Sequence, residues 1–172
     1  MVPIVSIVGK SGSGKTVLME QLIAEFKRRG FKVAALKHSR GGIEMDYRGK
    51  DSWRYAQAGS DAVLVSSPGK LVYIKKLDHE LNMEEIMPIL DQEFDLVLVE
   101  GFQKSRIPKI EVHRKDLGDD LLFSPEVLSA IVTDEAFATD VAQLSRGDIA
   151  GIADFIERNF VSKSRDRALL PP

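Results

Sequence analysis

The sequence lacks cysteine altogether, and neither sign of charge dominates it. Without cysteine there can be no disulfide bond, no thiolate metal ligand and no thiol nucleophile. Lysine and arginine together number 24 and aspartate and glutamate 26, so the formal net charge of the 172 residues is −2. Such a balance argues against a generally cationic protein that binds nucleic acid.

Long apolar runs are also missing. The unbroken apolar stretches are short, as at residues 96–99, whereas a bilayer-spanning helix needs about 20 apolar residues. We therefore predict no membrane association. The first nine residues have neither a basic lead nor a small-residue cleavage site, so we also predict no secretory signal and expect a cytoplasmic protein.

The composition is that of a folded chain. Hydrophobic residues make up 44% and charged residues 29% of the sequence, a mixture that can bury a core and that excludes wholesale disorder. The length suits a single domain, which we place at residues 1–160. The segment 161–172 is basic and ends in Leu-Leu-Pro-Pro, and we predict a flexible tail there.

Strand and helix patterns alternate along the chain. Short apolar runs predict strands, and apolar residues at helical spacing predict helices. The predicted strands are 4–8, 32–36, 95–100, 109–113 and 128–133, and the predicted helices are 16–29, 52–58, 83–90 and one that Asp148 caps. Two further apolar runs, 62–65 and 71–74, enclose turn residues and predict a hairpin. The alternation predicts an α/β fold with a mainly parallel sheet, helices on both faces and this added β-hairpin.

Pro88 interrupts one of these helical patterns. Proline in a regular helix interior costs roughly 3 kcal/mol. We therefore expect a kink or an early end in the helix at 83–90.

One segment carries a specific phosphate-binding motif. Residues 9–16 match G-x-x-x-x-G-K-[ST], between a predicted strand and a predicted helix. Its glycines let backbone N–H groups surround a phosphate, and the helix N-terminus adds partial positive charge. The alternative is a glycine-rich turn with a solvated lysine. The motif predicts a nucleoside triphosphate bound in the three-layer P-loop NTPase fold. The residues expected to bind it are Gly9, Lys10, Ser11, Gly12, Ser13, Gly14, Lys15, Thr16 and Val17.

Two side chains of the motif have distinct expected roles. Lys15 can reach the β- and γ-phosphates, and the hydroxyl of Thr16 can bind Mg²⁺. A second metal ligand is expected from a carboxylate that ends a neighbouring strand, and Glu100 has that place. We assign catalytic roles to Lys15 and Glu100, and metal ligation to Thr16, Glu100 and Asp51. Asp51 and Asp46 flank a loop and compete for the same metal-binding role. The alternatives are that Asp51 and Asp46 are solvated carboxylates and that Glu100 is an ordinary strand-end acid that caps a turn.

Three further residues lie near the motif in this interpretation. Lys37 and His38 end the second predicted strand and could face the phosphates, although a lone histidine is more often a structural residue. Lys10 is the second residue of the motif. In some dimeric P-loop ATPases a lysine there reaches the partner subunit, but a solvated loop lysine is the simpler expectation here.

Together these motifs resemble those of the MobB family, the nucleotide-binding adaptors of molybdopterin guanine dinucleotide biosynthesis. The resemblance covers roughly residues 2–160. The Lys-His, Gly-Lys-Asp-Ser and Glu-Gly-Phe segments make it much more specific than the phosphate motif alone. The matching segments are 9–16, 37–38, 46, 49–52, 58–59, 95–102, 108–112 and 131–134.

The resemblance implies a fold related to the signal-recognition and metal-chaperone GTPases, with Mg·GTP as ligand, weak GTPase activity and a homodimer. It also implies association with the molybdenum-cofactor guanylyltransferase, with molybdenum-insertion enzymes and with molybdopterin. Members of the family often carry more histidines after Lys-His, whereas this chain has Ser39-Arg40-Gly41-Gly42. Arg40 is either a phosphate contact or solvated. The alternative functions are a small P-loop kinase and a non-catalytic nucleotide-dependent adaptor.

Two expectations concern the base and the dimer. Asp134 follows a predicted strand, where its carboxylate could accept hydrogen bonds from guanine N1–H and the exocyclic amine; alternatively it caps the following helix or turn. The hairpin within 62–74 is the candidate subunit contact, because short apolar edge strands invite pairing. Alternatively, the hairpin simply extends its own sheet. With no evident built-in arginine finger, we expect slow hydrolysis.

Overall fold

The computed structural model describes residues 2–39, 41, 43, 47–90 and 93–162. Their contacts form two compact units. The main unit comprises residues 1–38 and 83–172, and the second unit is the segment 39–82 inserted between them. The sequence patterns indicated one domain over 1–160 and held no sign of this division.

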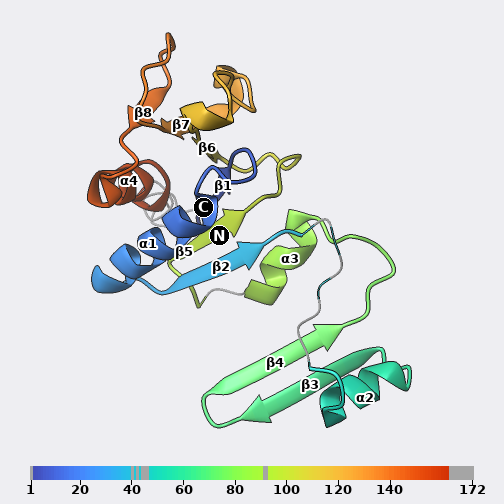
Figure 1. The fold of residues 1–172 in the computed structure, drawn as a ribbon. Helices are drawn as coiled ribbons and strands as arrows, with labels where there is room; N and C mark the ends of the chain where they lie inside the picture. The colour runs from blue at the N-terminus through green and yellow to red at the C-terminus, as the bar shows by residue number, and fades with distance from the viewer. Residues whose placement is uncertain (1, 40, 42, 44–46, 91–92, 163–172) are drawn as a thin grey trace, which may run out of the picture. The chain divides into compact units, whose positions relative to one another are not determined.

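A six-stranded parallel sheet forms the centre of the main unit (Figure 1). The strand order is β2-β5-β1-β6-β7-β8. The strands are β1 (Ile4–Val8), β2 (Val33–Lys37), β5 (Leu96–Glu100), β6 (Lys109–Val112), β7 (Leu128–Val132) and β8 (Ala142–Leu144). The predicted parallel sheet is confirmed, and β8 is a strand that the sequence did not predict.

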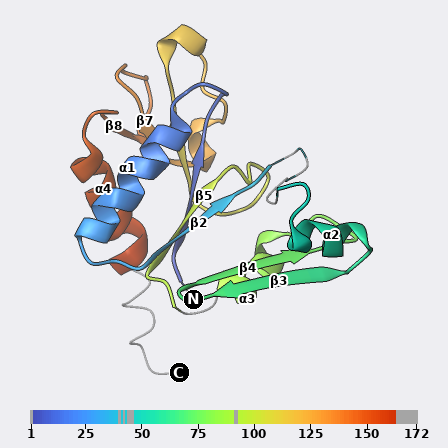
Figure 2. The ribbon, with the colours of Figure 1, turned by 60° about the horizontal axis from the view of Figure 1, so that its bottom comes forward.

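One face of the sheet is covered by α1 (Lys15–Arg28) and α4 (Ile149–Ile156), which lie side by side in Figures 1 and 2. A π-helical turn, Glu157–Val161, continues α4. Leu22 and Phe26 of α1 are fully buried with Ile152 of α4, because their helical spacing places them on the faces that meet the sheet.

The opposite face is covered by α3 (Met83–Leu90). Met83 and Leu90 pack against Val97 and Val99 of β5, so the predicted helices on both faces are confirmed. The helix ends at Leu90, two residues after Pro88. Among the described residues, no helix is long and apolar enough to cross a bilayer.

The second unit contains α2 (Asp51–Gln57) and the antiparallel strands β3 (Ala62–Ser67) and β4 (Lys70–Lys75). The hairpin prediction is confirmed. Within the described residues these two strands pair with each other and not with the main sheet, so the alternative in which the hairpin extends that sheet is wrong. α2 packs against β3, and Val63 is buried there.

Candidate nucleotide-binding site

The phosphate-binding loop follows β1 at the carboxyl edge of the main sheet. The connection after β1 runs toward β2 on one side of it, whereas the connection after the neighbouring strand β6 runs toward β7 on the other side. Ligands of open α/β sheets bind at such a place. Gly9 has φ +143°, and a Cβ atom built on it would collide with the carbonyl oxygen of Val112. The loop therefore needs glycine at this position because β6 passes too close for a side chain.

Lys15 is held over this loop by its own backbone. Its Nζ donates to the carbonyl oxygens of Gly9 at 3.0 Å and Lys10 at 2.7 Å. Burial lowers the pKa of Lys15, the nearby Glu100 carboxylate opposes that effect, and Lys37 reinforces it. The ammonium thus lies over the loop, with an acid nearby that favours its charged form; its contact with phosphates stays a prediction.

The start of α1 is suited to bind an anion. Gly14 precedes the helix with φ +97°, and no side chain among the described residues caps the first turn. Nearby, the Ser13 hydroxyl is buried without a hydrogen-bond partner in the described structure. Uncapped N–H groups at a helix N-terminus bind phosphate oxygens and bring the positive end of the helix dipole to them. The residues present therefore fit a phosphate group.

Thr16 and Glu100, the two predicted metal ligands of the main unit, are neighbours. The Thr16 hydroxyl donates to Glu100 Oε2 at 3.3 Å, and Lys37 Nζ lies 3.7 Å from Glu100 Oε1. A hydroxyl beside a carboxylate is the oxygen donor set that Mg²⁺ takes together with phosphate oxygens. The described residues contain no cluster of three acidic or histidine side chains that could hold a metal alone, so substrate oxygens and water would supply the other ligands.

Two further residues, Asp51 and Asp46, were predicted as metal ligands. Asp51 belongs to the second unit, where its Oδ1 lies 3.6 Å from Nη1 of Arg54. Asp46 and Arg40 lie outside the described residues. Ligation by Asp51 therefore stays a prediction.

His38 packs at the same sheet edge as Glu100. Its backbone N–H donates to the Glu100 carbonyl at 2.9 Å, and its ring lies 4.5 Å from that of Phe102, centroid to centroid. Between them, Gly101 has φ +99°, and a Cβ there would lie 3.2 Å from Cβ of His38. These contacts give His38 a structural role in shaping the turn after β5.

The expectation of a solvated Lys10 side chain is wrong. Lys10 is half-buried, and its Nζ donates to the carbonyl oxygen of Leu117 at 3.2 Å. Leu117 ends a short 3₁₀ helix, Lys115–Leu117, which follows β6. Since β6 lies next to β1, the lysine reaches this segment within its own chain.

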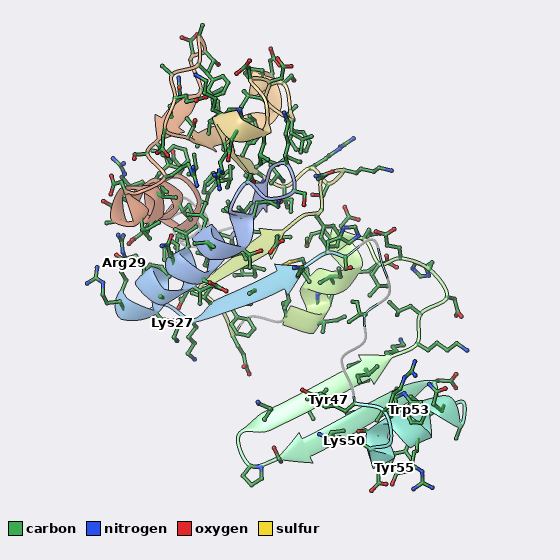
Figure 3. The ribbon with its side chains drawn as sticks, viewed as in Figure 1. Lys27, Arg29, Tyr47, Lys50, Trp53 and Tyr55 are labelled. Carbon is green, nitrogen blue, oxygen red and sulfur yellow. The ribbon has the colours of Figure 1, made fainter. Side chains whose placement is uncertain are left out.

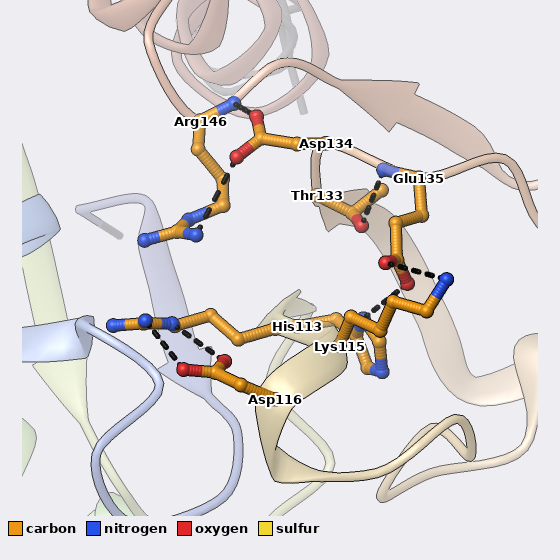
Figure 4. A pocket seen from close by; sticks show the side chains of 8 residues that line it. His113, Lys115, Asp116, Thr133, Asp134, Glu135 and Arg146 are labelled. Carbon is orange, nitrogen blue, oxygen red and sulfur yellow. Dashed lines mark hydrogen bonds and ion pairs between the residues drawn. The ribbon is translucent and has the colours of Figure 1, made fainter.

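A cavity of about 240 Å³ lies at the carboxyl ends of β6 and β7 (Figure 4). Asp134, Glu135 and Arg146 line one part of it, and His113 and Lys115 line another. Its size is below that of a typical pocket for a drug-sized ligand and suits one part of a nucleotide. Asp134 thus lines a cavity at this edge of the sheet, and its contact with a base stays a prediction.

Asp134 is paired with Arg146. Its Oδ1 accepts from the backbone N–H of Arg146 at 3.3 Å, and its Oδ2 accepts from Nη1 of the same residue at 3.4 Å. The turn after β7 is capped instead by Thr133, whose Oγ1 accepts from the N–H of Glu135 at 3.1 Å. In the described structure the next element after Asp134 is the strand β8 and not a helix, so the alternative in which Asp134 caps a following helix is wrong.

Two buried charged residues on β6 hold the loops beside the site. Lys109 donates to the carbonyl oxygens of Ser105 and Ile107. Glu111 accepts from the N–H groups of Leu122 at 2.6 Å and Phe123 at 3.1 Å. Burial lowers the pKa of Lys109 and raises that of Glu111, although the two N–H donors oppose the second effect. No role was predicted for either residue from the sequence.

Comparison with known proteins decides the family. The model of molybdopterin guanine dinucleotide synthesis protein B, MobB, matches residues 4–134, more than half of the sequence. The chain belongs to the MobB family. The predicted resemblance is thus confirmed, and the phosphate loop and the sheet edge around Glu100 fall within the matched residues.

Individual MobB relatives agree over most of the chain. The molybdopterin-guanine dinucleotide biosynthesis adapter protein of Haemophilus influenzae is 37% identical over 157 residues, which are 91% of this chain and 88% of the relative. The Escherichia coli adapter protein is 32% identical over 162 residues, 91% of this chain and 92% of the relative. A crystal structure of MobB superposes with a TM-score of 0.71 at 30% identity, covering 90% of this chain and 97% of the other. The MobB structures share the P-loop NTPase fold predicted from the sequence.

Proposed function

We propose that this chain is a GTP-binding adapter of molybdopterin guanine dinucleotide biosynthesis, with a slow Mg²⁺-dependent GTPase activity. The observation that carries the proposal is the phosphate loop, which holds Lys15 in place beside the Thr16–Glu100 pair. Family membership supplies the pathway, because the two curated relatives are named as adapter proteins of this biosynthesis.

The main unit offers groups for each part of the ligand. The loop N–H groups and the N-terminus of α1 would bind phosphate oxygens, and Lys15 would add positive charge there. Thr16 and Glu100 would bind Mg²⁺, which neutralises charge on the phosphates when it is bound. Asp134 would accept hydrogen bonds from guanine. Asp51 is retained as a candidate metal ligand.

The proposed partners follow from the family. They are a second copy of this chain, the guanylyltransferase that couples molybdopterin to GTP, the molybdenum-insertion enzymes and molybdopterin itself. An adapter in this sense brings a nucleotide and its consuming enzyme together. The exposed apolar side chains Leu64, Leu71 and Tyr73 of the hairpin in the second unit support the proposal of a homodimer.

Nucleotide binding is tested by titrating the protein calorimetrically with a non-hydrolysable GTP analogue and Mg²⁺. Lys15→Ala removes a charge-assisted contact, so we expect affinity to fall about tenfold to over a hundredfold. Lys27→Ala is the matched control, because Lys27 is an exposed lysine in the last turn of the same helix. Equal affinity in wild type and Lys15→Ala would refute the assignment.

Hydrolysis is tested by phosphate release from Mg·GTP. We expect turnover below about 1 s⁻¹, because P-loop proteins without a supplied arginine or an ordered switch segment position the water poorly. Faster turnover by the isolated protein would mean that the chain contains its own arginine finger for the transition state. Complete absence of release would favour the non-catalytic adaptor, and transfer to an added acceptor would favour the kinase.

A further inference from the structure

Arg146 connects the two parts of the site. It follows β8 and lines the cavity that contains Asp134 (Figure 4). One guanidinium nitrogen, Nη1, donates to Asp134 at 3.4 Å. The other, Nη2, is the atom nearest to a Cβ built on Gly14, at 3.7 Å. The same side chain therefore touches the candidate base-binding carboxylate and lies beside the last glycine of the phosphate loop.

The two contacts follow the order of groups in a nucleotide. In any nucleoside phosphate, the sugar and the α-phosphate connect the base to the outer phosphates. Here Arg146 lies between the carboxylate that would bind the base and the start of the helix that would bind the phosphates. Its guanidinium thus has the charge and the position to bind the connecting α-phosphate.

The Arg146–Asp134 pair is weaker than the neighbouring Arg114–Asp116 pair in the same cavity. Arg114 donates two short hydrogen bonds to Asp116, from Nε to Oδ1 at 2.9 Å and from Nη2 to Oδ2 at 2.6 Å. Asp134 receives one guanidinium nitrogen at 3.4 Å, beyond the usual hydrogen-bond length. Arg146 can therefore leave Asp134 at little cost, whereas Arg114 is held.

We propose that Arg146 exchanges partners when a guanine nucleotide binds, leaving Asp134 to the base and moving its guanidinium to the α-phosphate. The proposal rests on the proposed function, because it needs a guanine nucleotide in this site. Guanine presents two N–H donors that replace the guanidinium on Asp134. Adenine presents an acceptor at N1 instead, so it leaves the pair intact and Arg146 away from the phosphate. Arg146 thereby strengthens phosphate binding only when the base is guanine, and it is a specificity-determining residue.

The experiment compares GDP with guanosine, which lacks all phosphates. Both compete against a fluorescent GDP analogue on wild type and Arg146→Met. We expect Arg146→Met to weaken GDP binding about tenfold or more, the usual effect of losing a charge-assisted contact. Guanosine should bind as tightly as to wild type or up to about fivefold tighter, because an exposed ion pair with Asp134 no longer has to be broken.

Three controls separate this exchange from a structural role. Arg28→Met removes an arginine paired with Glu25 on α1, and we expect it to leave both affinities unchanged. Arg146→Lys keeps the charge and should recover part of the GDP affinity. Thermal unfolding establishes that each variant is folded.

The possible outcomes are distinct. Weaker guanosine binding, unchanged GDP binding, or no recovery by Arg146→Lys overturns the exchange while the proposed function stands. If wild type binds no guanine nucleotide at all, the proposed function itself fails, and the exchange fails with it.

Discussion

Glu100 acts on two neighbours at once. It accepts a hydrogen bond from the Thr16 hydroxyl. Its charge also favours the protonated form of Lys15 and so opposes burial, which lowers the pKa of Lys15. Because two backbone carbonyls already hold the Lys15 ammonium over the loop, the side chain is ordered when the loop folds, and ligand binding does not carry that entropic cost. A single strand-end carboxylate thus serves both the cation and the candidate metal.

At the residue scale, Asp134 is the test of base preference. We expect wild type to prefer GTP to ATP in competition binding. Asp134→Asn replaces one carboxylate oxygen by an amide donor, which opposes the guanine N–H groups, and the preference should fall about tenfold to over a hundredfold. Asp140→Asn makes the same change of charge at an exposed loop residue and should keep the preference. ATP competing as well as GTP with wild type would remove the base-binding role from Asp134.

At the scale of elements, one arginine joins α1 to α4. Arg29 follows α1 directly and lies toward α4 in Figure 3. It donates to Glu25 at 2.8 Å, to Asp154 at 2.6 Å and to Glu157 at 3.0 Å. Its side chain is 17% exposed. These bonds fasten the two helices that cover one face of the sheet, and so they support the helix that begins at the phosphate loop.

This joint predicts a dependence of stability on acid. Hydrogen bonds from Arg28 and Arg29 lower the pKa of Glu25 from 4.5 to about 2. A lowered carboxyl pKa stabilises the folded state above the unfolded pKa, and the contribution is lost as pH falls through the folded pKa. The melting temperature of wild type should therefore exceed that of Glu25→Gln at pH 6, and the difference should shrink between about pH 4.5 and about pH 2.

Thermal unfolding at several pH values measures this effect. Glu20→Gln, an exposed glutamate of the same helix, is the control. A constant difference between wild type and Glu25→Gln across this range would contradict the assigned role of the carboxylate.

The elements also show how far sequence reasoning reaches. The capping of α4 by Asp148 was predictable, because it is a local contact. The Asp148 carboxylate accepts a hydrogen bond from the N–H of Gly151, three residues along the chain, at 2.9 Å. The phosphate loop was predictable because its motif is contiguous. β8 was not, since its three residues are held by pairing with β7 and have no periodicity of their own. Arg146 was missed because no sequence pattern relates it to Gly14, which is distant in sequence and lies beside its guanidinium only in the folded structure.

At the scale of the whole molecule, the second unit has an uncovered apolar face. Leu64 pairs directly with Tyr73, and Leu71 projects on the same side two residues along. These side chains are 62%, 49% and 64% exposed, respectively. A two-stranded hairpin is marginally stable by itself in water, and an exposed apolar patch commonly marks a protein interface. The hairpin therefore supports the proposed homodimer.

Light scattering at micromolar concentration tests this interface. We expect wild type to behave as a particle of twice the chain mass and Leu64→Glu to shift it toward the monomer, because a buried unpaired carboxylate opposes association. Ser67→Glu places the same charge on the other face of the hairpin and should leave the dimer intact. A monomeric wild type, or a dimer indifferent to Leu64→Glu, would contradict the hairpin interface.

The alternation along β6 has a consequence for folding. Ile110 and Val112 enter the core under α1 and α4, while Lys109 and Glu111 are buried on the other face, where loop carbonyls and N–H groups receive them. A slip of one residue against β1 or β7 would turn both charges into the apolar core, away from every one of those partners. The buried charges thus penalise misregistered pairing of a strand only four residues long. Apolar substitutes at 109 and 111 would preserve burial but remove that penalty, so such variants would lose fidelity of strand alignment.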